Sequence, residues 1–254
     1  MLKNKALMTH LVFGYPSFEE NQKLIATMAK AGVSFIEIQI PFSDPIADGP
    51  TILKANQKSL EQGTKVKDCF EFVAKMTKSY PQIRFLIMTY YNIIFNYGTE
   101  AFIKKAKKIG IYGLIVPDLP PEEDSEQFYN LSKKNQINPI AVISPTTSHK
   151  RLNLIKKNGR GFIYSTSRVG ITGSPKKEAE NLKNFILKVK KKIGLPVAVG
   201  FGINTIEKAK EISAWADIIV IGSKVINLIE ENPKNYQEKV YLFLIKIIKN
   251  IKNN

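Results

Sequence analysis

Eight short, apolar and β-branched runs recur along this chain, and a helical pattern separates each one from the next. The runs occupy residues 6–13, 34–40, 83–90, 112–116, 139–143, 161–164, 196–200 and 217–221. Continuous apolar runs of this length are typical of parallel strands that are buried on both faces. Eight such strands alternating with helices over 254 residues predict a (β/α)8 barrel, a single domain spanning residues 1–254. A doubly wound sheet is the structural alternative.

Helix start signals fall in the segments between the runs. Ser17 begins a capping-box sequence, and Pro50 suits the first turn of a helix. Further helices are predicted after Pro121 and after Asn204, and a lysine-rich final helix at about residues 236–251. No low-complexity segment or sequence repeat divides the chain into halves.

The net charge of +16 raises the question of nucleic-acid binding. Only four of the 38 basic residues are arginines, the residue type that base readout and bidentate phosphate recognition favour. The many lysines are therefore interpreted as a solvated surface, with no nucleic-acid partner, that favours small anionic substrates.

Membrane and secretory roles are not expected. The most apolar stretch is interrupted by Arg84, Thr89 and Asn92, and the first residues lack the cleavage site of a signal peptide. Cys69 is the single cysteine, so no internal disulfide is possible. A reducing compartment is predicted, the cytoplasm or alternatively a plastid stroma.

A pair of carboxylates stands out at the second predicted strand. Glu37 lies within an isoleucine-rich run, where an ionised side chain needs a hydrogen-bond partner or a position at the strand end. Asp48 follows in a loop that Pro41, Pro45 and Pro50 stiffen. The spacing predicts an acid–base pair, with one member held by the sheet and the other by a loop that can close.

Glycine-rich turns follow the last three predicted strands, at residues 167–174, 199–204 and 221–224. Glycines let backbone N–H groups approach an anion, and helices beginning near Asn204 and Ser223 would direct their positive ends toward it. In a (β/α)8 barrel these turns lie at the carboxyl rim, where phosphate sites occur. A phosphate-bearing substrate is therefore predicted.

Several long motifs resemble one known family. They are EIQIPFSDPIADGPTI (37–52), MTYYNIIFNYG (88–98), GLIVPDLPPEE (113–123), FIYSTSRVGITGS (162–174), VAVGFGI (197–203) and VIGSKVI (220–226). In this order, and over essentially the whole chain, they are similar to the tryptophan synthase alpha subunit. The resemblance implies a lyase of aromatic amino-acid biosynthesis that cleaves indole-3-glycerol phosphate by a retro-aldol step to indole and glyceraldehyde 3-phosphate. It also implies an α2β2 heterotetramer, in which pyridoxal phosphate belongs to the beta subunit and this chain has no cofactor.

The resemblance places the catalytic carboxylates of the family on Glu37 and Asp48. Glu37 matches the proton shuttle, Asp48 the group that accepts a hydrogen bond from the indole N–H, and Tyr164 and Tyr90 match pocket aromatics. The substrate phosphate positions match Gly173, Gly202, Gly222 and Ser223. Two alternatives stay open: a stand-alone lyase that releases free indole, and a non-catalytic activator of a beta subunit.

The other polar residues of the sequence are interpreted as structural. Asp44 is expected to cap a turn, and His10 and His149 to be structural histidines. Asp118 is predicted either to orient the Asp48 loop or a partner surface, or to cap the following helix. Two distant histidines and one cysteine offer no typical metal site.

The sequence departs from the family pattern at two positions. Gln39 stands where the family usually has glycine, and Tyr15 where it has an acidic residue. The first strand begins almost at the start of the sequence, where family members carry a leading helix. Residues 168–176 resemble the lid of the family, whose closure would exclude water.

Overall fold

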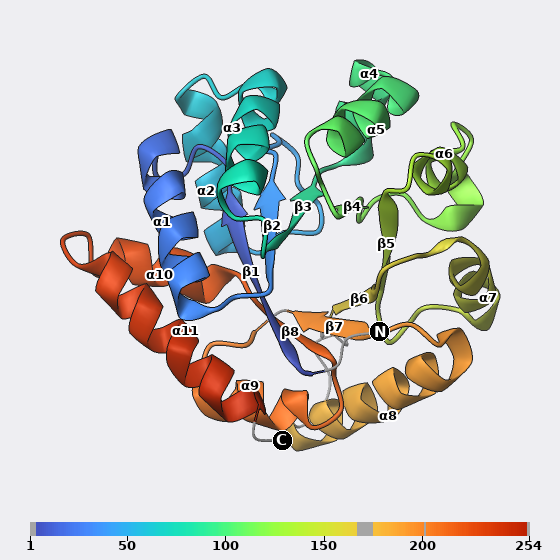
Figure 1. Cartoon of the computed structure of the whole chain (residues 1–254). Coiled ribbons are helices and arrows are strands. Elements are labelled where there is room, and N and C mark those ends of the chain that lie inside the picture. The colour runs from blue at the N-terminus through green and yellow to red at the C-terminus, as the bar shows by residue number, and fades with distance from the viewer. Residues whose placement is uncertain (1–3, 167–174, 201, 253–254) are drawn as a thin grey trace.

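The predicted strands pair in sequence order and close into a parallel barrel in the computed structural model, which describes residues 4–166, 175–200 and 202–252 (Figure 1). Within these residues the strands are β1 (Ala6–Val12), β2 (Phe35–Gln39), β3 (Arg84–Met88), β4 (Gly113–Ile115), β5 (Asn138–Ile143), β6 (Ile163–Thr166), β7 (Val197–Gly200) and β8 (Ile218–Ile221). Because β8 also pairs with β1, the sheet has no edge. The (β/α)8 barrel is confirmed, and the doubly wound alternative is excluded.

Helices surround the barrel and cover its outer face (Figure 1). They are α1 (Phe18–Ala31), α2 (Pro50–Glu61), α3 (Val66–Ser79), α4 (Tyr91–Tyr97), α5 (Thr99–Lys108), α6 (Phe128–Lys134), α7 (His149–Asn158), α8 (Pro175–Ile193), α9 (Ile206–Ser213), α10 (Ser223–Glu231) and α11 (Tyr236–Lys252). Ser17 caps α1 by accepting a hydrogen bond from the Glu20 backbone N–H, and Pro50 opens α2, as predicted. No helix in the described part of the chain is long and apolar enough to cross a bilayer.

The helix predicted after Pro121 is interrupted. A short 3-10 turn (Pro121–Glu123) comes first, and α6 begins only at Phe128. The carboxylate of Asp124 accepts hydrogen bonds from the backbone N–H groups of Phe128 and Tyr129, and Gln127 has a left-handed backbone conformation, φ 55°. The aspartate therefore caps a new helix start, where the sequence pattern alone predicts one continuous helix.

Side chains alternate along each strand between the outer helical layer and the barrel interior. Ile36 and Ile38 of β2 pack in the large cluster that includes the helices. Phe35 instead packs in a second cluster with side chains of other strands, and Glu37 lines a cavity. Since the side-chain period of a strand is two, Phe35, Glu37 and Gln39 all face inward.

Large apolar side chains fill the interior at the amino ends of the strands. Phe35 packs edge-on against Phe162, with ring centroids 5.6 Å apart. The guanidinium of Arg84 lies 5.3 Å from the ring centroid of Phe35 and 5.5 Å from that of Tyr112. These contacts form a solid floor beneath a polar layer that holds His10 and Glu37, at matching positions of β1 and β2.

A tight turn after β1 joins the barrel to α2. Gly14 has φ +83°, and a Cβ atom there would lie 2.5 Å from the Ser59 hydroxyl and 2.6 Å from the Thr64 hydroxyl. The Ser59 hydroxyl in turn donates to the carbonyl of Phe13. Only glycine fits this position without displacing α2, the helix that follows the Asp48 loop.

Replacement of Gly14 is expected to destabilise the fold far more than replacement of Gly63. Gly63 also has a left-handed backbone, φ +78°, but nothing lies within 4 Å of its added Cβ. We expect Gly63→Ala to cost about 1–2 kcal/mol of unfolding free energy, and Gly14→Ala about 1–3 kcal/mol more because of overpacking. Urea unfolding measures both values, and equal losses would contradict the close contact.

Candidate active site

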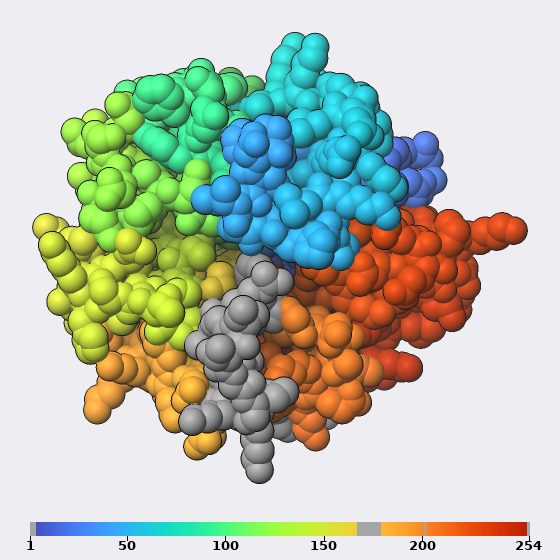
Figure 2. All heavy atoms as spheres, turned by 180° about the vertical axis from the view of Figure 1, so that it is seen from behind, coloured from blue at the N-terminus to red at the C-terminus, as the bar shows by residue number. Residues whose placement is uncertain are grey.

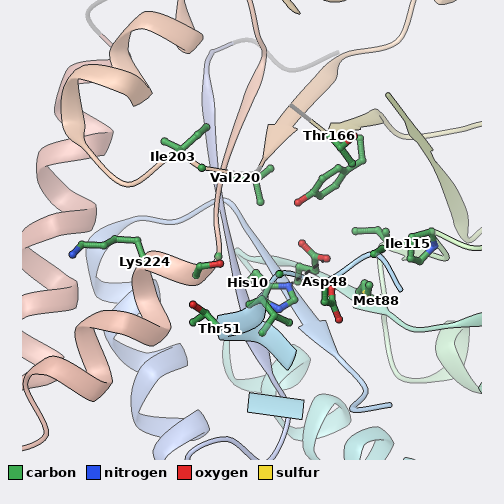
Figure 3. Close-up of a pocket in the computed structure, with 18 of the residues that line it drawn as sticks. His10, Asp48, Thr51, Met88, Ile115, Thr166, Ile203, Val220 and Lys224 are labelled. Atoms are coloured by element: carbon green, nitrogen blue, oxygen red, sulfur yellow. Dashed lines mark ion pairs between the residues drawn. The ribbon is translucent and has the colours of Figure 1, made fainter. Parts of the chain in front are cut away.

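A cavity of about 360 Å³ opens at the carboxyl ends of the strands (Figure 3). Its volume falls in the usual range of small-molecule sites, about 300–1,000 Å³. His10, Glu37 and Tyr164 line it from the strands, and Asp48 lines it from the loop after β2. Figure 3 shows His10 and Asp48 next to each other in the middle of this cavity.

Glu37 is a buried carboxylate, 3% exposed. Its Oε1 atom lies 3.4 Å from Nδ1 of His10, which is the ion pair of this site. Its Oε2 atom has no hydrogen-bond partner among the described residues. A buried carboxylate oxygen that faces a cavity without a partner is free to contact a ligand.

Asp48 is tied to the barrel by two amide side chains. Its Oδ2 atom accepts hydrogen bonds from Nε2 of Gln39 at 2.6 Å and from Nδ2 of Asn56 at 3.4 Å. Oδ1 of Asn56 also accepts from the backbone N–H of Phe42, so the same amide fixes both ends of the loop. Burial raises the pKa of Asp48, although the Gln39 hydrogen bond and the positive charge of His10 oppose the rise.

The two tyrosines predicted to line the site lie in different surroundings. Tyr164 lines the cavity, and burial together with the charges of Glu37 and Asp48 raises the pKa of its hydroxyl. Tyr90 does not line it: its hydroxyl accepts a hydrogen bond from the backbone N–H of Ala47 at 3.0 Å, and its ring stacks on Phe42. Tyr90 therefore supports the loop that carries Asp48.

The predicted anion-binding turns lie at the same cavity. Gly202, Gly222 and Ser223 all line it, and Ser223 is the first residue of α10. The first turn of α10 has no side-chain cap, so its backbone N–H groups and positive helix end suit an anion. Gly173 and most of the predicted lid, residues 168–176, lie outside the described residues.

Asp118 and Asp44 occupy different positions. Both carboxylate oxygens of Asp118 accept from the backbone N–H of Tyr91 at 3.0 Å, so Asp118 caps α4 and not the helix that follows it. Asp44 is exposed on the loop, where its carboxylate accepts from the Ser43 hydroxyl. Both contacts agree with structural roles.

His10, which the sequence predicts to be structural, lines the cavity beside Glu37. The sequence pattern gives no sign of this position. The register of β1 against β2 makes His10 the direct neighbour of Glu37. His149 is the exposed first residue of α7, where its Nε2 lies 3.1 Å from Nζ of Lys188.

Metal ligands are not clustered anywhere in the described ranges, since no group of three or more His, Cys, Asp or Glu side chains could hold an ion. The arrangement offers instead two carboxylates at one side of the cavity and backbone N–H donors at the other. Fold and site together place the chain among the (β/α)8-barrel enzymes, whose active sites lie at the carboxyl ends of the strands.

Comparison with known proteins agrees with this class. The family described as tryptophan synthase alpha chain matches residues 2–253. The tryptophan synthase alpha chain of Desulfotalea psychrophila is 48% identical over 230 residues, which cover 91% of this chain and 90% of the relative. The crystal structure of tryptophan synthase subunit alpha from Legionella pneumophila superposes with a TM-score of 0.90 at 31% identity, and covers 98% of this chain and 94% of the other. Tryptophan synthase from M. tuberculosis, in its aminoacrylate-bound form, superposes with a TM-score of 0.86 at 27% identity over 98% of this chain and 94% of that one.

The chain belongs to the tryptophan synthase alpha chain family. It is a lyase of tryptophan biosynthesis, and the reaction of its family is the cleavage of indole-3-glycerol phosphate to indole and glyceraldehyde 3-phosphate. The alpha chain of this family needs no cofactor of its own, because pyridoxal phosphate belongs to the beta subunit.

The burial of Asp48 predicts a pH-dependent gain in stability for Asp48→Asn. A raised pKa means that the ionised carboxylate opposes folding above that pKa, and this penalty disappears as the pH falls through the folded value toward 3.8, the ordinary pKa of an aspartate. Asn can still accept the Gln39 hydrogen bond. We expect Asp48→Asn to melt at a higher temperature than the wild type at pH 8 and to lose this advantage near pH 4. Asp44→Asn, in the exposed part of the loop, is the control, and an equal gain there would contradict the explanation.

Proposed function

We propose that Glu37 and Asp48 are the acid–base pair with which this chain cleaves indole-3-glycerol phosphate. The observation that supports the proposal is the convergence of both carboxylates on one buried cavity, with Oε2 of Glu37 unpartnered among the described residues. The non-catalytic activator is disfavoured, because an activator has no need of this pair.

The chemistry moves one proton from oxygen to carbon. A proton added at indole C3 places positive charge on the ring nitrogen. As the adjacent glycerol hydroxyl loses its proton, its oxygen forms the aldehyde C=O while the C–C bond to C3 breaks, and the electron pair of that bond returns to the ring and neutralises the nitrogen. Glu37 suits the proton transfers, and Asp48 suits a hydrogen bond from the indole N–H that stabilises the cationic ring.

The substrate phosphate is proposed to bind at Gly202, Gly222 and Ser223, with Gly173 as a further contact. Support comes from the uncapped start of α10 and from glycines that line the cavity. Tyr164 is proposed to contact the substrate between the phosphate and the carboxylates. Tyr90, which the sequence predicts as a substrate contact, is proposed to act through the loop, since its hydroxyl holds the backbone of Ala47.

Glu37→Gln and Asp48→Asn are expected to lower the rate of indole formation by about 10²–10⁴-fold each, the usual contribution of a positioned acid or base. The assay follows indole release from indole-3-glycerol phosphate at saturating substrate. Asp44→Asn is the matched control, because it removes a carboxylate from the same loop outside the cavity, and we expect it to keep wild-type turnover. Unchanged turnover in both Glu37→Gln and Asp48→Asn would overturn the assignment.

A beta subunit is the proposed partner, in an α2β2 assembly that receives the indole. The rim around the cavity carries two exposed apolar side chains: Ile46, 83% exposed on the loop after β2, and Phe95, 57% exposed on α4. Figure 2 shows these blue and green segments side by side on one face. Apolar anchors on a rim next to the site suit a subunit that docks over it.

Ile46→Asp and Phe95→Asp are expected to weaken activation by a beta subunit by about tenfold or more in its half-saturating concentration, since each places a charge at an apolar contact. The rate of the isolated chain should stay within about twofold of wild type. Leu242→Asp, which alters an exposed leucine on the outer helix α11, is the control. A chain that is fully active alone, and indifferent to the beta subunit, would instead be a stand-alone lyase.

The whole sequence, residues 1–254, is proposed to form this one domain, and the protein is proposed to work in the cytoplasm. Cys69 is a buried free thiol, which suits a reducing compartment.

A further inference from the structure

The ion pair between His10 and Glu37 lies inside the barrel. His10 is 7% exposed and Glu37 3% exposed, and the two residues face each other from neighbouring strands. Rigid strands on both sides fix the separation of Nδ1 and Oε1 at 3.4 Å. The pair therefore has little freedom to rearrange, unlike an ion pair between long side chains on a surface.

Two carboxylates share this cavity, so their charges oppose each other unless a cation compensates them. The groups around His10 show which cation is available. Glu37 faces it from β2 and Asp48 from the loop, Tyr164 lines the same cavity from β6, and β8 contributes only isoleucine and valine. Lys224 lines the cavity from α10, but its amine lies 3.7 Å from Glu231 and points away from His10 (Figure 3).

We infer that His10 is a positioning residue, whose imidazolium holds Glu37 as an oriented carboxylate and leaves Oε2 of Glu37 for the substrate. This inference rests on the proposed role of Glu37 in the lyase reaction. Oε2 of Glu37 and Nε2 of His10 both lack a partner among the described residues, so the pair uses one atom of each side chain and leaves the other atom free.

The charge state of His10 agrees with this geometry. Burial lowers the pKa of His10, but the charge of Glu37, the hydrogen bond to it and the charge of Asp48 outweigh burial and raise the pKa above the ordinary histidine value. The imidazolium thus persists to higher pH than in an isolated histidine.

Titration of the imidazole nitrogens by NMR tests the pair without any enzymatic assay. The sequence has two histidines, so the exposed His149 provides an internal reference in every spectrum. We expect Glu37→Gln to lower the pKa of His10 and Asp48→Asn to lower it less. An identical His10 titration in wild type and Glu37→Gln would overturn the inference, whether or not the chain cleaves indole-3-glycerol phosphate.

The pH profile of the lyase reaction tests what the pair does for Glu37. His10→Phe removes both the donor and the charge, and we expect kcat to fall by about 10–100-fold with KM within about twofold. The pH profile of kcat should also change, because the imidazole 3.4 Å from the Glu37 carboxylate, whose charge varies with pH, is gone.

His10→Asn separates position from charge, because its amide keeps a donor near the place of Nδ1. We expect it to recover part of kcat while its pH profile still differs from that of the wild type. Profiles of both variants that coincide with that of the wild type would overturn the inference. A wild-type chain that forms no indole would count against the proposed function alone, since the NMR titration decides on the pair independently.

Discussion

Closure of eight parallel strands into a barrel decides where every polar side chain of this site can lie. Each strand sends alternate side chains inward, so Glu37 and Gln39 face the same interior as Phe35. An ionisable group in an apolar strand would be costly if it pointed at the helices, but near the carboxyl end of a barrel strand it reaches the mouth of the cavity. The outward isoleucines of β2 pack against the helical layer and hold the strand in place, while the inward Glu37 faces the cavity.

The loop after β2 adds the second carboxylate under a different constraint. No strand holds Asp48, so its position depends on hydrogen bonds from Gln39 and Asn56 and on the contact between Tyr90 and Ala47. Asp118 contributes from further away by capping the helix that begins after Tyr90. A chain of neutral hydrogen bonds can hold a buried carboxylate and still release it when the loop moves, whereas an ion pair would hold it more tightly.

The strand order, the helix starts at Ser17 and Pro50, and the convergence of Glu37 and Asp48 could be predicted from the sequence, because apolar periodicity and capping chemistry are local signals. The significance of His10 could not, because it depends on the register between two strands, which no local pattern fixes. Gln39 is a second example. The sequence shows that Gln39 departs from the family pattern, but it does not show the hydrogen bond from Gln39 to Asp48, which forms only when the strand and the loop are folded together. The break before α6 depends likewise on one aspartate that competes with helical continuity.

The filled amino end of the barrel limits the routes by which products can leave the cavity. Phe35 packs against Phe162 inside the barrel, and Arg84 lies over the ring of Phe35, so among the described residues the amino end of the interior is filled and the cavity opens at the carboxyl rim. Because the amino end is filled, we expect indole and glyceraldehyde 3-phosphate both to leave the cavity toward the carboxyl rim. The order of product release then depends on what covers the carboxyl rim. A subunit bound over the rim would receive the indole directly as it leaves the cavity.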